Sequence, residues 1–258
     1  MTTAITRYFN SVFTLTEFEL RKVRHDTSQI WLRLVQPALW LLVFGTVFSQ
    51  IRGISTGDYS YLQFMTPGVL AQSVMFVAIF YGITVVWERD LGLLNKLLST
   101  PAPRSAIVLG KALSAGVRGV FQAVAVMALA LIIRVQLTLT VWSVLGVFAI
   151  IILFGMCFAS LSMSLAPIFR TRERMMGIGQ AITMPLFFAS NAIYPISMMP
   201  SWLKPIVIIN PLSYVVDAMR ALLVTNDFSS LGIDILALLA ATIVLVSLAS
   251  IAFRKILS

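Results

Sequence analysis

The sequence contains few charged residues and almost none of the side chains on which common catalytic and metal sites depend. Only 11% of its 258 residues are charged, whereas an ordinary soluble domain has about 25%. A single cysteine, Cys157, excludes an internal disulfide. A single histidine, His25, excludes a multi-histidine metal site and the H-E-x-x-H motif of zinc proteases. These absences argue against a membrane-embedded enzyme.

The sequence also lacks a nucleotide-binding loop. Gly110-Lys111 is the nearest match, but Ser105 stands where a P-loop needs its first glycine and Ala112 where it needs serine or threonine. No intramembrane carboxylates suggest a proton or sodium relay, which disfavours a secondary transporter or channel. The chain therefore resembles a transport pathway that takes its energy from elsewhere.

Apolar residues make up 59% of the chain, more than a soluble domain of this length could bury. The net charge of +9 could otherwise suggest nucleic acid, but this composition excludes a nucleic-acid-binding domain. Apolar runs near the roughly 20 residues that a span requires predict an all-α integral membrane protein with six transmembrane helices. The expected spans are residues 34–51, 61–87, 105–133, 141–169, 175–194 and 233–253. Lys111 and Arg118, in the third run, are expected to reach out to the interface.

Basic residues are distributed unevenly between the connections. Fifteen of the 19 lysines and arginines lie in segments 1–33, 88–118, 170–174 and 254–255. The other four are Arg52, Arg134, Lys204 and Arg220. By the positive-inside rule, both termini are expected in the cytoplasm.

Residues 5–24 have apolar side chains at the period of an α-helix. The apolar positions are Ile5, Tyr8, Phe9, Val12, Phe13, Thr16, Leu20 and Val23. Glu17 and Arg21, on the other face, have the spacing of an ion pair. This segment is too polar to span a membrane, so we expect an amphipathic helix along the cytoplasmic interface rather than a simple leader.

The connection of residues 88–104 predicts a short cytoplasmic helix that ends before Pro101. Leu91, Leu94 and Leu98 share a face that should hold this helix against the bundle. The polar residues Glu88, Arg89, Asn95 and Lys96 would then face the cytosol. The alternative is an ordinary interfacial helix with no partner.

The outer connection, residues 195–232, is long, apolar and interrupted by prolines, which favours short helices that dip into the outer leaflet. Asn210-Pro211 predicts the start of one of them, with asparagine as N-cap and proline at the first helical position. Asp217 and Arg220 are three residues apart and are expected to pair, either as a functional feature or as a solvated interfacial one.

The chain contains three short motifs whose order and spacing resemble those of the membrane subunits of type-2 ABC exporters. This group includes daunorubicin-resistance and nodulation-factor permeases. They are Tyr61-Leu-Gln-Phe-Met-Thr-Pro-Gly68, Glu88-Arg-Asp-Leu-Gly92 with Pro101-Ala-Pro-Arg104, and Asn210-Pro-Leu-Ser-Tyr214 with Arg220. Together with the leader and the six runs, the resemblance covers nearly the whole chain as a single transmembrane domain.

This resemblance implies a non-catalytic permease in a bacterial inner membrane. Two copies would join two separate ATPase subunits, which would hold the ATP and Mg²⁺, so this chain would bind no cofactor itself. The ATPase-coupling residues would be Glu88, Arg89, Asp90, Gly92, Leu94, Asn95 and Lys96. The outer gate would contain Asn210, Pro211, Tyr214, Asp217 and Arg220.

The cargo is left open among the substrates of this family. A hydrophobic drug-like or lipid-like molecule is favoured, and a lipid-linked oligosaccharide or polysaccharide is the alternative. Aromatic and small polar residues suit the wall of such a pathway. The expected lining residues are Phe44, Phe187, Phe188 and Asn191.

Overall fold

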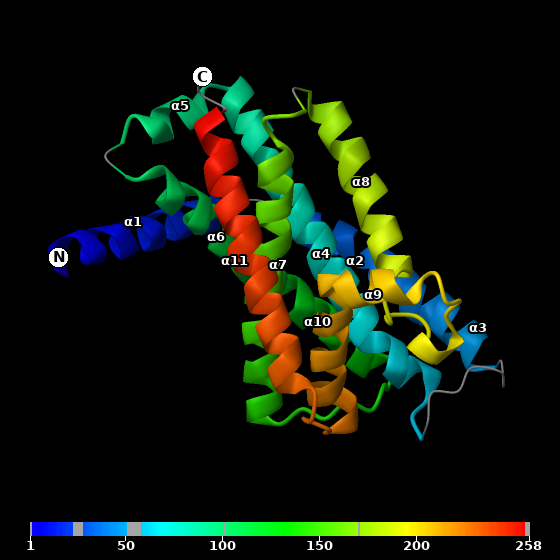
Figure 1. Ribbon diagram of the computed structural model, residues 1–258. Coiled ribbons are helices and arrows are strands. Elements are labelled where there is room, and N and C mark those ends of the chain that lie inside the picture. The colour runs from blue at the N-terminus through cyan, green and yellow to red at the C-terminus, as the bar shows by residue number, and fades with distance from the viewer. Residues whose placement is uncertain (1, 23–27, 51–57, 101, 170, 256–258) are drawn as a thin grey trace.

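The computed structural model describes residues 2–22, 28–50, 58–100, 102–169 and 171–255, and this part of the chain contains helices and no strand. The long helices form an upright bundle, and α1 projects from its side (Figure 1). The helices are α1 (Thr2–Arg21), α2 (Ser28–Leu39), α3 (Gly45–Ser49), α4 (Tyr61–Asp90), α5 (Leu93–Leu98), α6 (Arg104–Ile132), α7 (Val141–Leu165), α8 (Arg172–Phe188), α9 (Lys204–Ile209), α10 (Pro211–Arg220) and α11 (Leu231–Lys255). The π-helical turn η2 (Trp40–Phe44) joins α2 to α3, and η4 (Ala221–Thr225) follows α10.

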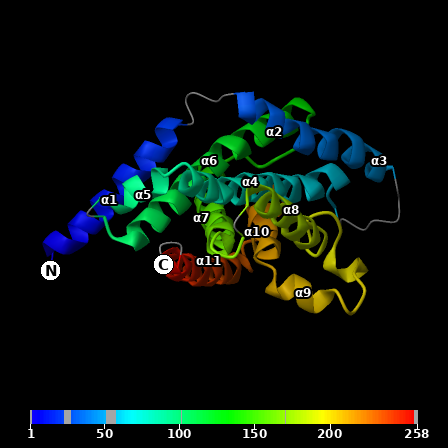
Figure 2. The same cartoon turned by 90° about the horizontal axis from the view of Figure 1, so that it is seen from above.

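In this part of the chain, five helical stretches are long and apolar enough to cross a membrane. They are Leu32–Ser49, Tyr61–Asp90, Arg104–Ile132, Val141–Leu165 and Leu231–Phe253. Most of α4 is buried at the centre of the bundle, whereas the first and last of these stretches are largely exposed (Figure 2). The end at which α4 ends and α6 and α8 begin, at the top of Figure 1, is called the basic end below.

Small residues allow the central helices to approach closely. A Cβ atom on Gly155 of α7 would lie 2.7 Å from the Cα atom of Gly116 on α6. A Cβ atom on Gly116 would lie 2.5 Å from the carbonyl oxygen of Ile152. In a membrane, such backbone-to-backbone packing replaces the hydrophobic effect as the source of helix association, so these two glycines fix the α6–α7 crossing.

Helix α1 packs against α6 with only part of its apolar surface. Val12 and Thr16 are buried there, and Gly110 of α6 gives room to the side chain of Leu15. Phe9 and Phe13, on the same expected apolar face, are 55% and 63% exposed. The helix expected over residues 5–24 is present, although residues 23 and 24 lie outside the described part. Its exposed phenylalanines are suited to an interfacial position.

The fifth expected span is shorter than the sequence predicts. We expected a helix to residue 194, but α8 ends at Phe188 after 17 residues. That length is about 26 Å, less than the roughly 30 Å of a bilayer core. The Asn210 side-chain amide donates to the carbonyl oxygens of Leu186 and Ala189, both at 2.7 Å. These bonds satisfy carbonyl groups at the end of α8, so the chain can turn there without leaving them unpaired.

The segment expected to form the coupling helix is divided into two helices. Helix α4 continues through Glu88 to Asp90, and Gly92 then has a φ of +71°, which a residue with a side chain rarely adopts. The separate helix α5 follows. The expectation of one helix over residues 88–99 was therefore wrong, and Gly92 is the reason.

Candidate functional site

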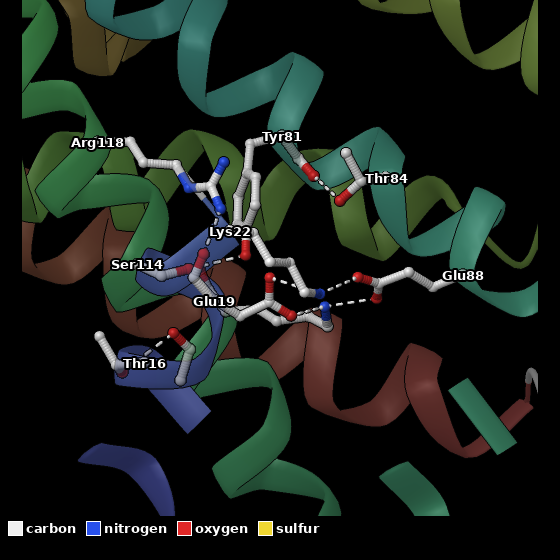
Figure 3. Close-up of polar contacts among 10 residues, drawn as sticks. Thr16, Glu19, Lys22, Tyr81, Thr84, Glu88, Ser114 and Arg118 are labelled. Atoms are coloured by element: carbon white, nitrogen blue, oxygen red, sulfur yellow. Dashed lines mark hydrogen bonds and ion pairs between the residues drawn. The ribbon is translucent and has the colours of Figure 1, made fainter. Parts of the chain in front are cut away.

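A buried ionic cluster joins three helices at the basic end of the bundle. Glu19 of α1 and Lys22, the residue that follows α1, meet Glu88 near the end of α4 (Figure 3). Lys111 of α6 completes the cluster, which is called the inner ionic cluster below. Glu19 and Lys111 are 92 positions apart in the sequence, so only the packing of α1 on α6 brings them together.

Both lysines bridge both carboxylates. Lys111 Nζ lies 2.6 Å from Glu19 Oε1 and 2.5 Å from Glu88 Oε2. Lys22 Nζ lies 3.1 Å from the other oxygen of each carboxylate. The side chains of Lys111 and Glu19 are each only 2% exposed. Burying charges is tolerable here because each has an opposite partner at hydrogen-bonding distance.

Further polar contacts attach the cluster to the helices around it. Thr16 Oγ1 donates to the carbonyl oxygen of Gly110 at 3.2 Å, and Arg118 Nη2 donates to the carbonyl oxygen of Glu19 at 2.6 Å. The guanidinium of Arg118 lies 4.2 Å from the ring centre of Tyr81, whose hydroxyl bonds to Ser114 (Figure 3). Helix α1 is thus held to α4 and α6 by charges and hydrogen bonds, and the cation–π contact of Arg118 with Tyr81 joins α6 to α4 beside it.

The cluster changes the acid–base properties of α1. Burial raises the pKa of Glu19. The charge and hydrogen bond of Lys111 and the charge of Lys22 lower it, and together they outweigh burial, so the pKa of Glu19 lies below its ordinary value. Burial lowers the pKa of Lys22, but the charges of Glu19 and Glu88 overcome this effect and raise it. Both groups are therefore charged at neutral pH.

Two expectations about these residues were wrong. Glu88 was expected to face the cytosol, but it is only 8% exposed and pairs with Lys111 and Lys22. Lys111 was expected to reach the interface, but it points into the cluster. Sequence reasoning missed the cluster, although a lysine inside a long apolar run is itself a signal that a buried partner is needed.

The surface beside α5 retains part of the expected coupling face. Asp90 and Lys96 are exposed, and Arg89 Nη2 pairs with Asp90 at 3.1 Å. Leu94 is fully buried, as expected for the side that holds α5 to the bundle. Leu91 is 70% exposed, which contradicts that expectation, because the turn at Gly92 rotates it away from Leu94. The side chains of Asn95 and Leu98 lie outside the described part.

A second polar cluster, called the outer cluster below, lies toward the opposite end. Arg220 Nη1 pairs with Asp217 at 2.9 Å, which confirms the predicted ion pair. Arg220 Nη2 also donates to the carbonyl oxygens of Asn191 at 2.8 Å and Phe64 at 3.4 Å, and the guanidinium lies 4.0 Å from the Phe64 ring centre. The Asn191 amide donates to Asp217 at 2.5 Å. The Arg220 side chain is only 12% exposed, so the interpretation of a solvated pair was wrong.

The start of α4 supplies the other wall of the outer cluster. The Tyr61 hydroxyl donates to the carbonyl oxygen of Ile193 at 3.0 Å. A Cβ atom on Gly68 would lie 2.5 Å from the carbonyl oxygen of Ala192, so glycine permits this contact. The motif of residues 61–68 thus packs directly on the segment after α8. Sequence reasoning gave no signal that this motif and Arg220 meet.

The motif that begins at Asn210 folds as predicted. The Asn210 side chain accepts a hydrogen bond from the backbone N–H of Leu212 at 3.0 Å, and Pro211 is the first residue of α10. The Tyr214 hydroxyl donates to the carbonyl oxygen of Ile208 at 2.6 Å and so ties α10 to α9. Asn210 therefore serves both as N-cap of α10 and as donor to the end of α8.

The residues expected to line a pathway fall into two groups. Phe187 and Asn191 are buried within the bundle, and Phe187 packs edge-on to Trp40. Phe44 and Phe188 are 43% and 46% exposed and flank the same tryptophan. Of the four expected lining residues, only Phe44 and Phe188 are exposed enough to contact a cargo within one copy of the chain. Among the described residues, no cluster of three or more potential metal ligands occurs.

Comparison with known proteins places these features in a family. The model of the ABC-2 type transporter family matches residues 10–224, which include both polar clusters. The chain belongs to the ABC-2 type transporter family. It is therefore a multi-pass transport permease, the membrane component of an ABC transporter, and members of this family associate with an ABC ATPase subunit.

Curated relatives of this ABC-2 permease are similar over most of its length. A putative transport permease, ycf38, of Cyanophora paradoxa is 30% identical over 73% of this chain, and the match covers 66% of that relative, just under two thirds. The daunorubicin resistance permease DrrB1 of Streptomyces coeruleorubidus is 26% identical, with 78% of this chain and 70% of the relative covered. Nodulation protein J of Rhizobium meliloti is 25% identical, with 86% and 84% covered.

Proposed function

We propose that the chain is the membrane subunit of an ATP-driven exporter and receives the motion of its ATPase through α1 and α5. The observation that carries the proposal is the inner ionic cluster. Because Glu88 lies two residues before the end of α4 and pairs with Lys111, a displacement of α5 is passed to α4 and α6 together. Glu19 and Lys22 bring α1 into the same unit. Such a rigid unit suits rigid-body opening of a path between two copies.

The proposed assembly holds two copies of this chain and two ATPase subunits. ATP and Mg²⁺ belong to the ATPase, since this sequence lacks a phosphate-binding loop. We place the basic end and both termini in the cytoplasm of a bacterial cell, by the charge asymmetry. The chain then forms one transmembrane domain of six spans, in which α8 is the fifth and α9 and α10 form a re-entrant pair on the outer side.

The outer cluster is proposed to control the exit. Arg220 links α10 to the start of α4 and to the segment after α8, so these three parts move as one. The exposed rings of Phe44 and Phe188 are the proposed wall for cargo. The proposed cargo is hydrophobic or amphipathic and lipid-like, which the apolar surroundings of these rings favour, and a lipid-linked oligosaccharide or polysaccharide is the alternative.

Charge reversal on the α5 surface tests the coupling proposal. Arg89→Glu and Lys96→Glu should lower both transport and co-purification of the ATPase about tenfold or more, because a docked partner would bury part of this polar surface. Insertion and thermal stability of the permease should be unchanged. Glu88→Lys is unsuitable, because it would place a third positive charge in the buried cluster and disturb the fold.

The matched control is Lys204→Glu, an exposed charge reversal on α9. Arg52, another of the four basic residues outside the basic segments, lies outside the described residues. If the ATPase co-purifies equally with the two α5 variants and with Lys204→Glu, the coupling proposal is wrong.

A further inference from the structure

Two adjoining cavities open along α4 beside the inner ionic cluster. One, of about 330 Å³, lies among α1, α4 and α6 and is bordered by Glu88, Arg118 and Tyr81. The other, of about 360 Å³, lies between α2 and α4 and is bordered by Gln36, Gln72 and Phe76. Both are also lined by Arg33, Val77 and Phe80, so they form one groove, called the α4 groove below. Each part has the volume of a typical small-molecule site.

The length of the α4 groove matches one leaflet of a bilayer. From Glu88 to Gln72 it follows 16 residues of α4, which is about 24 Å. Half of a bilayer with its headgroups is about 20–22 Å thick. The groove therefore runs from the basic end to about the middle of the membrane.

The deep end of the groove contains a hydrogen-bond donor without a partner. Gln72 is only 2% exposed, and its amide nitrogen has no hydrogen-bond partner among the described residues. Leaving a buried amide unpaired costs free energy, so such a group is retained most readily where a ligand supplies the acceptor. The neighbouring Phe76, Val77 and Phe80 are apolar and would contact a hydrocarbon chain.

Among the described residues at the basic end of the groove, cations outnumber carboxylates: Lys22, Lys111 and Arg118 face only Glu19 and Glu88. Glu19 and Glu88 are occupied by Lys22 and Lys111. Arg118 has no carboxylate partner among the described ion pairs, and its buried Nε atom lacks an acceptor there. An anionic headgroup would be attracted to this end.

We infer that the α4 groove is the entry site for cargo, and that the cargo is an anionic amphipath with a hydroxyl or carbonyl group in its apolar part. The anion lies at Arg118, beside Tyr81, and the acceptor group lies at Gln72, nine residues or about 14 Å away along α4. This inference rests on the proposed export function, which it deepens by naming the class of substrate. It also accounts for two buried donors that the fold leaves unpaired.

Binding to the purified full-length chain in nonionic detergent tests the site separately from transport. The probes are radiolabelled 12-hydroxystearate, stearate and stearylamine. The wild type should bind 12-hydroxystearate about three- to tenfold more tightly than stearate, the gain expected of one hydrogen bond. Both anions should bind more tightly than stearylamine. Gln72→Leu should abolish only the preference for the hydroxyl group, because this variant removes an unpaired amide and keeps the volume.

Two further variants complete the test. Gln63→Leu, the same substitution at the opposite end of α4, should bind like the wild type. Arg118→Gln should weaken both anions about tenfold while the relative preference for 12-hydroxystearate remains. An equal preference in the wild type and Gln72→Leu, or tight binding of stearylamine, would overturn the inference.

Transport distinguishes cargo from a resident lipid. In vesicles that contain the permease with its ATPase, ATP should drive movement of 12-hydroxystearate, and Gln72→Leu should slow it about as much as it weakens binding. Binding without ATP-driven movement would overturn the assignment as cargo, leaving a site for an anionic membrane lipid. The proposed coupling at α5 is tested separately, by co-purification of the ATPase with the α5 variants.

Discussion

At the scale of single residues, Lys111 is the most consequential charge in this permease. It is fully buried and is the only cation of the inner ionic cluster that lies on a long membrane helix. Exposed charges behave differently: Glu17 and Arg21 pair on α1, but their side chains are 64% and 76% exposed. Burial, not the presence of an ion pair, determines how much each contributes to stability.

Replacing Lys111 with methionine should therefore destabilise the fold strongly. Lys111→Met removes the buried one of the two lysines that Glu19 and Glu88 share and leaves them only Lys22, whose side chain is 42% exposed, so we expect a loss of about 3–5 kcal/mol in the free energy of unfolding. Chemical or SDS unfolding in detergent measures the loss. Adding Glu19→Gln to this variant should restore part of it. Arg21→Ala, which removes an exposed partner, should cost no more than about 0.5 kcal/mol. Equal losses in Lys111→Met and Arg21→Ala would contradict this account.

At the scale of elements, the outer cluster joins three parts that are distant in sequence. Its centre is the arginine of α10, which bonds to Asp217, Asn191 and the backbone of α4 at Phe64. Two of its partners are carbonyl oxygens, so the cluster depends on the planar fork of a guanidinium and not only on positive charge.

Arg220→Ala should impair transport while the ATPase remains bound, since the outer cluster lies far from the α5 surface. Arg220→Lys should also impair it, because an ammonium group cannot maintain all of these contacts at once. Transport assays with co-purification of the ATPase check both variants. Lys204→Ala, on the exposed surface of α9, is the control and should behave as the wild type. Normal transport by Arg220→Ala would reduce the cluster to a structural cap.

At the scale of the whole molecule, α1 is an appendage that charges hold to the bundle. The lowered pKa of Glu19 means that its contribution to this attachment is present above its ordinary pKa of 4.5 and is lost as the pH falls through the lower value in the folded protein. The raised pKa of Lys22 means that its contribution is present below 10.5 and is lost as the pH rises through the raised value. Attachment of α1 should therefore be constant between these limits.

Acid should release α1 before the bundle unfolds. Spin labels on Thr14→Cys and Ser99→Cys, with Cys157 replaced by serine, report the distance between α1 and the α5 region. We expect a narrow distance distribution near neutral pH, which broadens once the pH has fallen far enough below 4.5 to protonate Glu19. Glu19→Gln should already be broad at neutral pH. A distribution for Glu19→Gln as narrow as that of the wild type at neutral pH would show that the charge of Glu19 does not hold α1.

Sequence alone determined the features that depend on composition and short spacing. The apolar runs located α4, α6, α7 and α11 to within a few residues, and Asn210-Pro211 located the start of α10. The motif order identified the family before any structural comparison. These features are local, because hydrophobic run length and helix caps are set by neighbouring residues.

Only the tertiary structure decided which charges are buried and where α8 ends. Lys111 and Glu88 were expected on the surface, but α1 covers them and supplies Glu19. Helix α8 was expected to continue to residue 194, but it ends at Phe188, where the side chain of Asn210 satisfies the carbonyl groups of Leu186 and Ala189. In each case the deciding partner is at least 20 residues away in sequence. No local pattern records such a contact, since it exists only once the helices pack.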